Sequence, residues 1–241
     1  MREPNHDIIS QLQQDILRMQ GFKSSIRADG QHVQLGPINQ AFPNNQFPIA
    51  AIHEFLAEST HQQSCSLGFV SGILSTLMNP DRVVLWISKD RTCFPPALPS
   101  FNIQPDKIIF IDLKKDKELL WTMEEALKCD ALAAVVGEIS DISFISSRRL
   151  QLAVEKSRVT GFVIRRQPRI VDANSFVSRW RISPLPSEPP TNLPGVGFAR
   201  WKVELLKIKN GKPGAWDVEW RKGKFRIIQV PETVMLERKI V

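Results

Sequence analysis

The chain alternates between short continuous apolar runs and longer stretches in which apolar residues recur every three or four positions. Continuous runs bounded by polar turns are typical of strands covered on both faces, and the wider spacing is typical of helices. The alternation therefore predicts a three-layer α/β core around a mainly parallel sheet. The expected strands are 83–88, 107–113, 131–139, 160–166 and a shorter one that ends near Glu58, and the expected helices are 66–78, 116–128 and about 146–157.

Two further helix features follow from the same pattern. Apolar residues from Ile8 to Met19 are spaced by three and four and are followed by Gly21, which predicts an amphipathic helix over 7–20. This helix is expected to pack on the domain or on a partner. Asp116 is expected to cap its helix, because its carboxylate can accept a hydrogen bond from a free amide there.

The pattern changes to strict alternation in the last third of the chain. FVSRWRI (176–182) predicts a strand, the prolines that follow predict an exposed loop, and alternation on both sides of Asn210-Gly211 predicts an antiparallel meander. The meander is expected to extend one edge of the parallel sheet. The alternating tryptophans predict one buried face of the hairpin, with stacking on nucleic-acid bases as the open alternative; they are Trp201, Trp216 and Trp220.

These signals predict one domain with extensions at both ends. The expected divisions are an N-terminal amphipathic helix and linker (1–29), an α/β core (30–183), a Pro-rich loop (184–198), a β-hairpin or meander of the same domain (199–230) and a tail (231–241).

Composition limits the class of protein. The chain has 241 residues, of which 42% are hydrophobic and 24% charged, as in ordinary globular proteins. No stretch approaches the roughly 18 consecutive apolar residues of a membrane helix. The cysteines Cys65, Cys93 and Cys129 are odd in number and widely spaced, so we expect reduced thiols and a cytoplasmic protein with no membrane association.

The charge is unevenly distributed. Residues 1–141 hold 12 Lys and Arg against 17 Asp and Glu, a net −5, whereas residues 142–241 hold 20 against 8, a net +12. A basic half points to nucleic acid or an acidic protein face as partner, and a surface that is basic only for solubility is the alternative. The candidate residues for DNA or partner contact are Arg148, Arg149, Arg179, Arg181, Lys207, Lys209 and Lys212.

Other constellations of reactive residues carry little signal. His32, His53 and His61 lack the spacing and the further ligands of a metal site, and Ser64 and Cys65 lack a nucleophile elbow. We therefore expect no catalytic residue, no metal and no cofactor. For Arg148 and Arg149 a buried ion pair within the fold, for instance with Glu138 or Glu155, is an equal rival interpretation.

Several segments together resemble the ImuA family, whose members are also described as SulA-like or RecA-like recombinase-domain proteins. The resemblance spans about residues 30–222, and its most specific parts are SRRLQLA (147–153) and the hairpin KNGKPG (209–214). It implies a RecA-like core and a role in error-prone, translesion DNA repair within the SOS response. It also implies partners: an ImuB-like relative of Y-family polymerases and an error-prone replicative-type polymerase, with RecA and single-stranded DNA as further candidates.

The residues test one part of that resemblance. A RecA-type ATPase needs a G-x-x-x-x-G-K-[ST] loop after its first core strand, where glycine amides and a lysine hold the phosphates. Residues 57–66 read AESTHQQSCS, with neither glycine nor lysine. Where a magnesium-binding aspartate is expected, the chain has Gly137 followed by Glu138, for which a surface or capping role is favoured over magnesium binding.

The sequence thus predicts a non-catalytic RecA-like accessory protein of damage-induced mutagenesis that docks polymerase partners. Two alternatives stay open. One is a residual nucleotide-binding or ATPase protein with an unusual site. The other is a cell-division inhibitor of the SulA kind, which would not need the long basic C-terminal half.

Overall fold

A computed structural model of the chain describes residues 33–189 and 195–228. The amphipathic helix predicted at 7–20 and the tail at 231–241 lie outside these residues. Within the described ranges, no helix is both long and apolar enough to cross a membrane.

In the described residues a nine-stranded sheet forms the centre of the fold, in the order β3-β2-β4-β5-β1-β6-β7-β8-β9. All neighbours from β3 to β6 are parallel, and those from β6 to β9 are antiparallel. The predicted parallel core and its antiparallel extension are thereby confirmed. The strands are β1 Ile52–Ala57, β2 Val84–Ser88, β3 Ile108–Asp112, β4 Ala134–Ile139, β5 Thr160–Arg166, β6 Ser178–Leu185, β7 Arg200–Ile208, β8 Gly214–Arg221 and β9 Lys224–Ile227.

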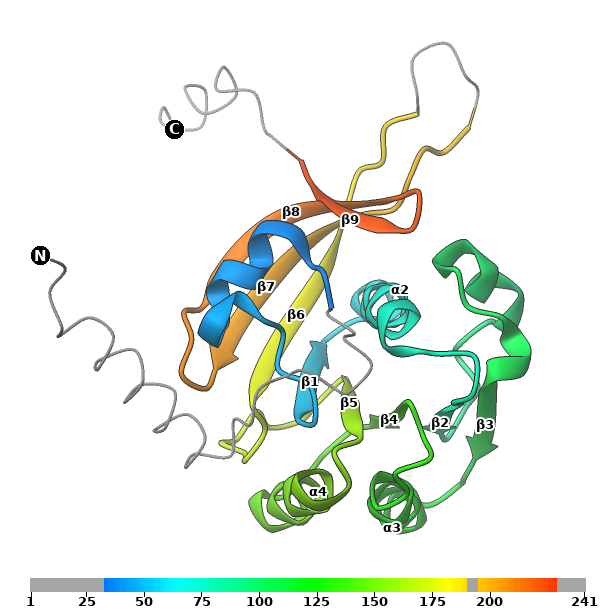
Figure 1. The fold of residues 1–241 in the computed structure, drawn as a ribbon, viewed down its shortest axis with the longest axis vertical. Helices are drawn as coiled ribbons and strands as arrows, with labels where there is room; N and C mark the ends of the chain where they lie inside the picture. The colour runs from blue at the N-terminus through cyan, green and yellow to red at the C-terminus, as the bar shows by residue number, and fades with distance from the viewer. Residues whose placement is uncertain (1–32, 190–194, 229–241) are drawn as a thin grey trace, which may run out of the picture.

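Helices cover both faces of the parallel strands, with α2 on one side and α3 and α4 on the other (Figure 1). Each side has its own apolar core, and the core beside α2 continues under the antiparallel strands. The α-helices are α2 Thr60–Leu77, α3 Asp116–Leu127 and α4 Phe144–Ser157, and the 3-10 turns are η1 Gly36–Ala41, η2 Pro43–Asn45, η3 Pro95–Phe101 and η4 Pro105–Lys107.

Helix α3 begins at the predicted Asp116, whereas the starts of α2 and α4 and the capping of α3 differ from the predictions. Helix α2 begins six residues before the predicted 66, because the Ser59 hydroxyl caps it by accepting from the Gln62 amide at 3.2 Å. Asp116 is the first residue of α3 and makes no capping hydrogen bond; its carboxylate lies 2.7 Å from the Lys89 ammonium instead. Helix α4 is capped by Ser143 and so begins two residues before the predicted position.

The antiparallel extension shares one sheet and one apolar core with the parallel strands. Trp201 and Trp220 are buried and Trp216 packs half-buried against the same core, which confirms the predicted buried face and excludes base stacking by the two buried indoles. The Phe225 ring lies so close to Gly72 of α2 that a Cβ there would come within 2.5 Å of it. Glycine at this position therefore lets β9 approach the helix.

Candidate functional site

The connection between β1 and α2 occupies the position of a phosphate-binding loop. Only Glu58 and Ser59 separate the strand from the helix. The Glu58 amide donates to Oε1 of Gln62 at 2.8 Å, and Ser59 caps the first turn. Because a P-loop wraps a triphosphate with about eight residues of backbone, this two-residue connection leaves no cradle for phosphates.

Glu138 is the buried carboxylate of β4, and it is 1% exposed. Its Oε1 accepts from the Trp86 indole at 2.9 Å, and its Oε2 accepts from Gln63 at 2.9 Å and from the Thr92 hydroxyl at 2.8 Å. A surface or capping role, as favoured from the sequence, is wrong. Both oxygens face neutral protein donors in a buried position, whereas Mg²⁺ in nucleotide sites keeps several waters and needs solvent-facing ligands.

The surroundings of Glu138 explain two other features of the sequence. A Cβ on Gly137 would come within 2.5 Å of the Met123 sulfur, so glycine at this position lets α3 pack against β4.

Burial raises the pKa of the Cys93 thiol to about 12, and the charge of Glu138 adds to the rise. Burial also raises the pKa of Cys65 to about 11. At neutral pH both thiols are protonated, unreactive and free, as predicted.

A second buried carboxylate, Glu54 of β1, is bound by two arginines. Its Oε1 lies 3.3 Å from Nη1 of Arg165, and its Oε2 accepts from Nε of Arg179. Arg165 is 2% exposed and also bridges to Asp141 at 3.1 Å and donates to the Ser140 carbonyl at 3.0 Å. Two acids and two arginines balance in charge, as an ionic network in the interior requires.

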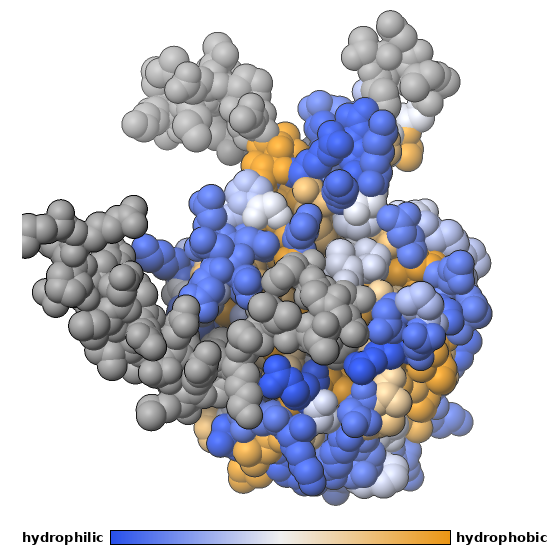
Figure 2. Space-filling view, viewed as in Figure 1, coloured by the Kyte–Doolittle hydropathy of each residue, from blue (hydrophilic) through white to orange (hydrophobic). Residues whose placement is uncertain are grey.

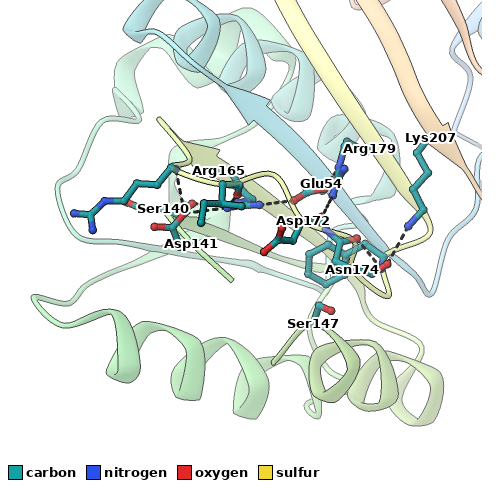
Figure 3. A network of polar contacts seen from close by, with 12 residues as sticks. Glu54, Ser140, Asp141, Ser147, Arg165, Asp172, Asn174, Arg179 and Lys207 are labelled. Atoms are coloured by element: carbon teal, nitrogen blue, oxygen red, sulfur yellow. Dashed lines mark hydrogen bonds and ion pairs between the residues drawn. The ribbon is translucent and has the colours of Figure 1, made fainter. Parts of the chain in front are cut away.

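This network continues into the loop between β5 and β6, residues 167–177 (Figure 3). The loop has no regular secondary structure, yet three basic side chains bind its carbonyls. The contacts run from Arg165 to Ile170 at 2.8 Å, from Arg179 to Asp172 at 2.7 Å and from Lys207 to Asn174 at 2.9 Å.

Comparison with known proteins agrees with the sequence motifs. No family model matches the chain. Over 191 residues it is 31% identical to Protein ImuA of Caulobacter vibrioides strain NA1000 / CB15N, an alignment that covers 74% of this chain and 78% of the relative. The chain belongs to the ImuA family. The same identity and coverage apply to Protein ImuA of the Caulobacter vibrioides strain ATCC 19089 / CIP 103742 / CB 15.

In this ImuA-family chain, two of the predicted contact residues hold the loop. Arg179 and Lys207 lie opposite each other in β6 and β7, and both donate to loop carbonyls. Burial, above all, lowers the pKa of Lys207, and the neighbouring Arg179 lowers it further, while Glu54 opposes the shift. Arg181 lies farther along β6 and pairs with Glu58 at 3.1 Å.

The other predicted contact residues lie elsewhere. Arg148 and Arg149 are in the second turn of α4, about half exposed, where Arg148 lies 3.9 Å from Glu155 and Arg149 lies 2.6 Å from Glu124. The expected pair with Glu155 thus exists but is exposed, and Glu138 pairs with neither arginine. Of the two hairpin lysines, the Lys209 amide bonds to Val177 and the Lys212 amide to Ala41.

The histidines form no site in the described residues, where no group of three or more His, Cys, Asp and Glu could hold a metal. His53 is fully buried; its Nε2 lies 2.7 Å from the Pro48 carbonyl and its Nδ1 lies 2.6 Å from the Ser178 hydroxyl. A carbonyl only accepts, so Nε2 carries the proton and Nδ1 accepts from Ser178. Burial lowers the pKa of His53 to about 3, which makes it a neutral structural residue, as the sequence favoured.

Sequence reasoning missed both networks. It weighed Arg165 only as one of the basic residues that could meet DNA, gave no role to Gln63 or Trp86, and treated Glu54 as part of an apolar strand. One signal was present: a carboxylate in the middle of a continuous apolar run must be buried and therefore needs a partner. The identity of that partner depends on the parallel pairing of β1 with β5 and β6, which no local pattern encodes.

Proposed function

We propose that the protein is a non-catalytic accessory factor of damage-induced, error-prone DNA synthesis, in which a RecA-like core acts as a docking scaffold. Membership of the ImuA family supports the role in mutagenesis, because the resemblance noted in the sequence carries that function. The contacts of the β1–α2 connection and of Glu138, where a RecA-type ATPase would bind its nucleotide, support the proposal that the protein is not a catalyst.

One observation carries the non-catalytic part. The two elements that would hold a nucleotide in a RecA-type ATPase are bonded to each other, since Gln63 of α2 donates to Glu138 of β4 at 2.9 Å. Phosphoryl transfer needs a lysine on the phosphates and a carboxylate free to bind Mg²⁺. Here the helix start offers Glu58 and Ser59 in place of a lysine, and the carboxylate is enclosed by Trp86, Gln63 and Thr92.

The partners we propose are an ImuB-like relative of Y-family polymerases and an error-prone replicative-type polymerase. RecA and single-stranded DNA are additional candidates. Among the predicted contact residues, Arg148 and Arg149 are the ones whose side chains are exposed on a helix, so they suit contact with a partner better than Arg179 and Lys207, which bind the 167–177 loop.

The role in mutagenesis is testable by genetics in the host that carries the gene. Deletion should abolish the rise in mutation frequency after ultraviolet irradiation and leave the spontaneous frequency unchanged, and the intact gene should restore the rise. An unchanged induced frequency would contradict the proposal. Cell filamentation on overexpression without DNA damage would favour a SulA-like inhibitor instead.

A further inference from the structure

Exposed large hydrophobic side chains gather on α4 and on the loop between β5 and β6, beside the central strands of the sheet. Among the described residues ten are exposed, and five of these lie on α4 or on the 167–177 loop. In the space-filling view, hydrophobic patches interrupt the polar surface in the lower part of the molecule, where α3 and α4 lie (Figure 2). The five are Phe144 (58% exposed), Ile145 (73%), Leu152 (48%), Ile170 (64%) and Val171 (44%).

The helix and the loop are joined, so their exposed residues belong to one surface. The Ser175 amide donates to the Ser147 hydroxyl of α4 at 3.1 Å. The Arg169 amide donates to Asp141, in the turn before α4, at 3.2 Å. Phe144 and Ile145 begin the helix beside that turn, and Ile170 follows Arg169 directly. We call α4 together with the 167–177 loop the α4–loop surface.

The loop is held in place before any partner binds. Its carbonyls at Ile170, Asp172 and Asn174 accept from basic side chains that are themselves bound to Glu54 or lie beside it. A preorganised loop loses little conformational entropy when it binds, so its exposed aliphatic residues are suited to be binding anchors. Exposed apolar residues clustered at a rigid position commonly mark an interaction site.

The charge around the surface selects the partner. Without the buried Arg165, residues 140–175 hold six Lys and Arg against three Asp and Glu, a net +3. A second copy of the chain would bring two basic surfaces together, which is unfavourable. Nucleic acid would gain from the charge, but sequence-tolerant stacking needs aromatic faces, and four of the five exposed residues are aliphatic.

We propose that the α4–loop surface is a docking site for a segment of a partner protein whose apolar side chains are flanked by carboxylates. Apolar residues of the segment contact Ile145 and Ile170, and its carboxylates approach Arg148 and Arg149. The proposal rests on the proposed function only in that an accessory protein requires a partner.

The test uses the full chain and a displayed library of random 12-residue peptides. We expect selected peptides to combine Leu, Ile or Phe with Asp or Glu. In fluorescence anisotropy, their affinity should fall about tenfold or more in Ile170→Asp and several-fold in Arg149→Glu, as expected for anchor and flanking residues. Val196→Asp makes the same change at an exposed aliphatic residue in the Pro-rich loop, and affinity should stay within about twofold.

Three outcomes would overturn the proposal. They are no enrichment of apolar-acidic peptides, binding that is unaffected by Ile170→Asp, and a labelled oligo-dT strand that binds this surface and loses binding in Ile170→Asp. Unfolding curves show that a variant is folded, and Ile145→Asp gives a second anchor variant. The outcome is separable from that of the proposed function, because nucleotide binding or unchanged mutagenesis would leave peptide binding as it is.

Discussion

Glu54 and Glu138, the two most deeply buried carboxylates of the described residues, lie on strands of one sheet and are bound in opposite ways. Three neutral side chains donate to Glu138: Trp86 from β2, Gln63 from α2 and Thr92 from the loop that follows β2. Two arginines bind Glu54, and the same arginines bind carbonyls of the 167–177 loop.

The contrast shows how one sheet can close one site and present another. Neutral donors satisfy Glu138, and one of them, Gln63, joins α2 to β4. This contact lies where a RecA-type ATPase would hold its nucleotide. Arginines have several donors in a fixed fork, so they satisfy Glu54 and still have donors left for the loop. The buried charge at Glu54 is thus linked through arginines to the 167–177 loop, whereas the one at Glu138 is linked through neutral donors to the start of α2 and to Thr92 in the loop after β2.

The largest loss of stability is expected at Glu54, because its negative charge is compensated by the positive charges of two arginines. Glu54→Gln leaves Arg165 and Arg179 without their buried anion and should lower the free energy of unfolding by about 3–5 kcal/mol. Urea denaturation followed by circular dichroism measures the loss. Glu118→Gln, an exposed carboxylate on α3, is the control and should change stability by less than about 0.5 kcal/mol. Equal stability of the two variants would mean that the network does not support the fold.

A smaller effect is expected at the other carboxylate. Glu138→Gln keeps an oxygen for the Trp86 indole but turns an amide toward Gln63 or Thr92, so the loss should be about 1.5–3 kcal/mol. The variant should also lower the pKa of Cys93, because the charge of Glu138 contributes to its rise. Thiol-labelling rates against pH measure this. A loss as large as that of Glu54→Gln would remove the distinction between the two sites.

Acid should lower the stability of the protein through His53, which neighbours Glu54 in β1 and points to the opposite face of the sheet. The pKa of His53 falls from its usual 6.5 to about 3 on folding, so between these values the unfolded chain binds a proton that the folded chain does not. Stability is therefore full above pH 6.5 and declines as the pH falls, by about 1.4 kcal/mol per unit. His53→Gln should remove that part of the slope between pH 6.5 and 5. Parallel stability-pH curves for the two proteins would contradict the buried neutral state.

The smallest effect on stability is expected at the exposed end of the Glu54 network. Ile170→Asp changes a side chain that is 64% exposed, while its carbonyl keeps the bond to Arg165. The free energy of unfolding should change by less than about 0.5 kcal/mol. A loss above 2 kcal/mol would mean that Ile170 packs into the fold and is not available to a partner.

Local patterns were sufficient for the strands of the parallel core. The apolar run at 160–166 matches β5 residue for residue, and AESTHQQSCS already excluded a glycine cradle. The start of α2 was missed because its first turn, from Thr60, is polar and adds nothing to an apolar stripe. Capping by Ser59, not periodicity, determines that boundary.

The roles of individual basic residues could not be predicted from local sequence. Arg165 and Arg166 are adjacent in the chain, yet one is buried against Glu54 and the other lies 3.3 Å from Asp90. Strand alternation explains why they face opposite sides, but only the strand order shows which side holds a carboxylate. The predicted contact residue Arg179 is bound by the fold for the same reason.

Calorimetric titration of the full chain with ATP and Mg²⁺ tests the closed nucleotide position most directly. The bonded Gln63 and Glu138 and the two-residue β1–α2 connection predict no detectable heat of binding. Binding at micromolar strength would contradict the scaffold function and would mean that α2 and β4 separate to admit a nucleotide.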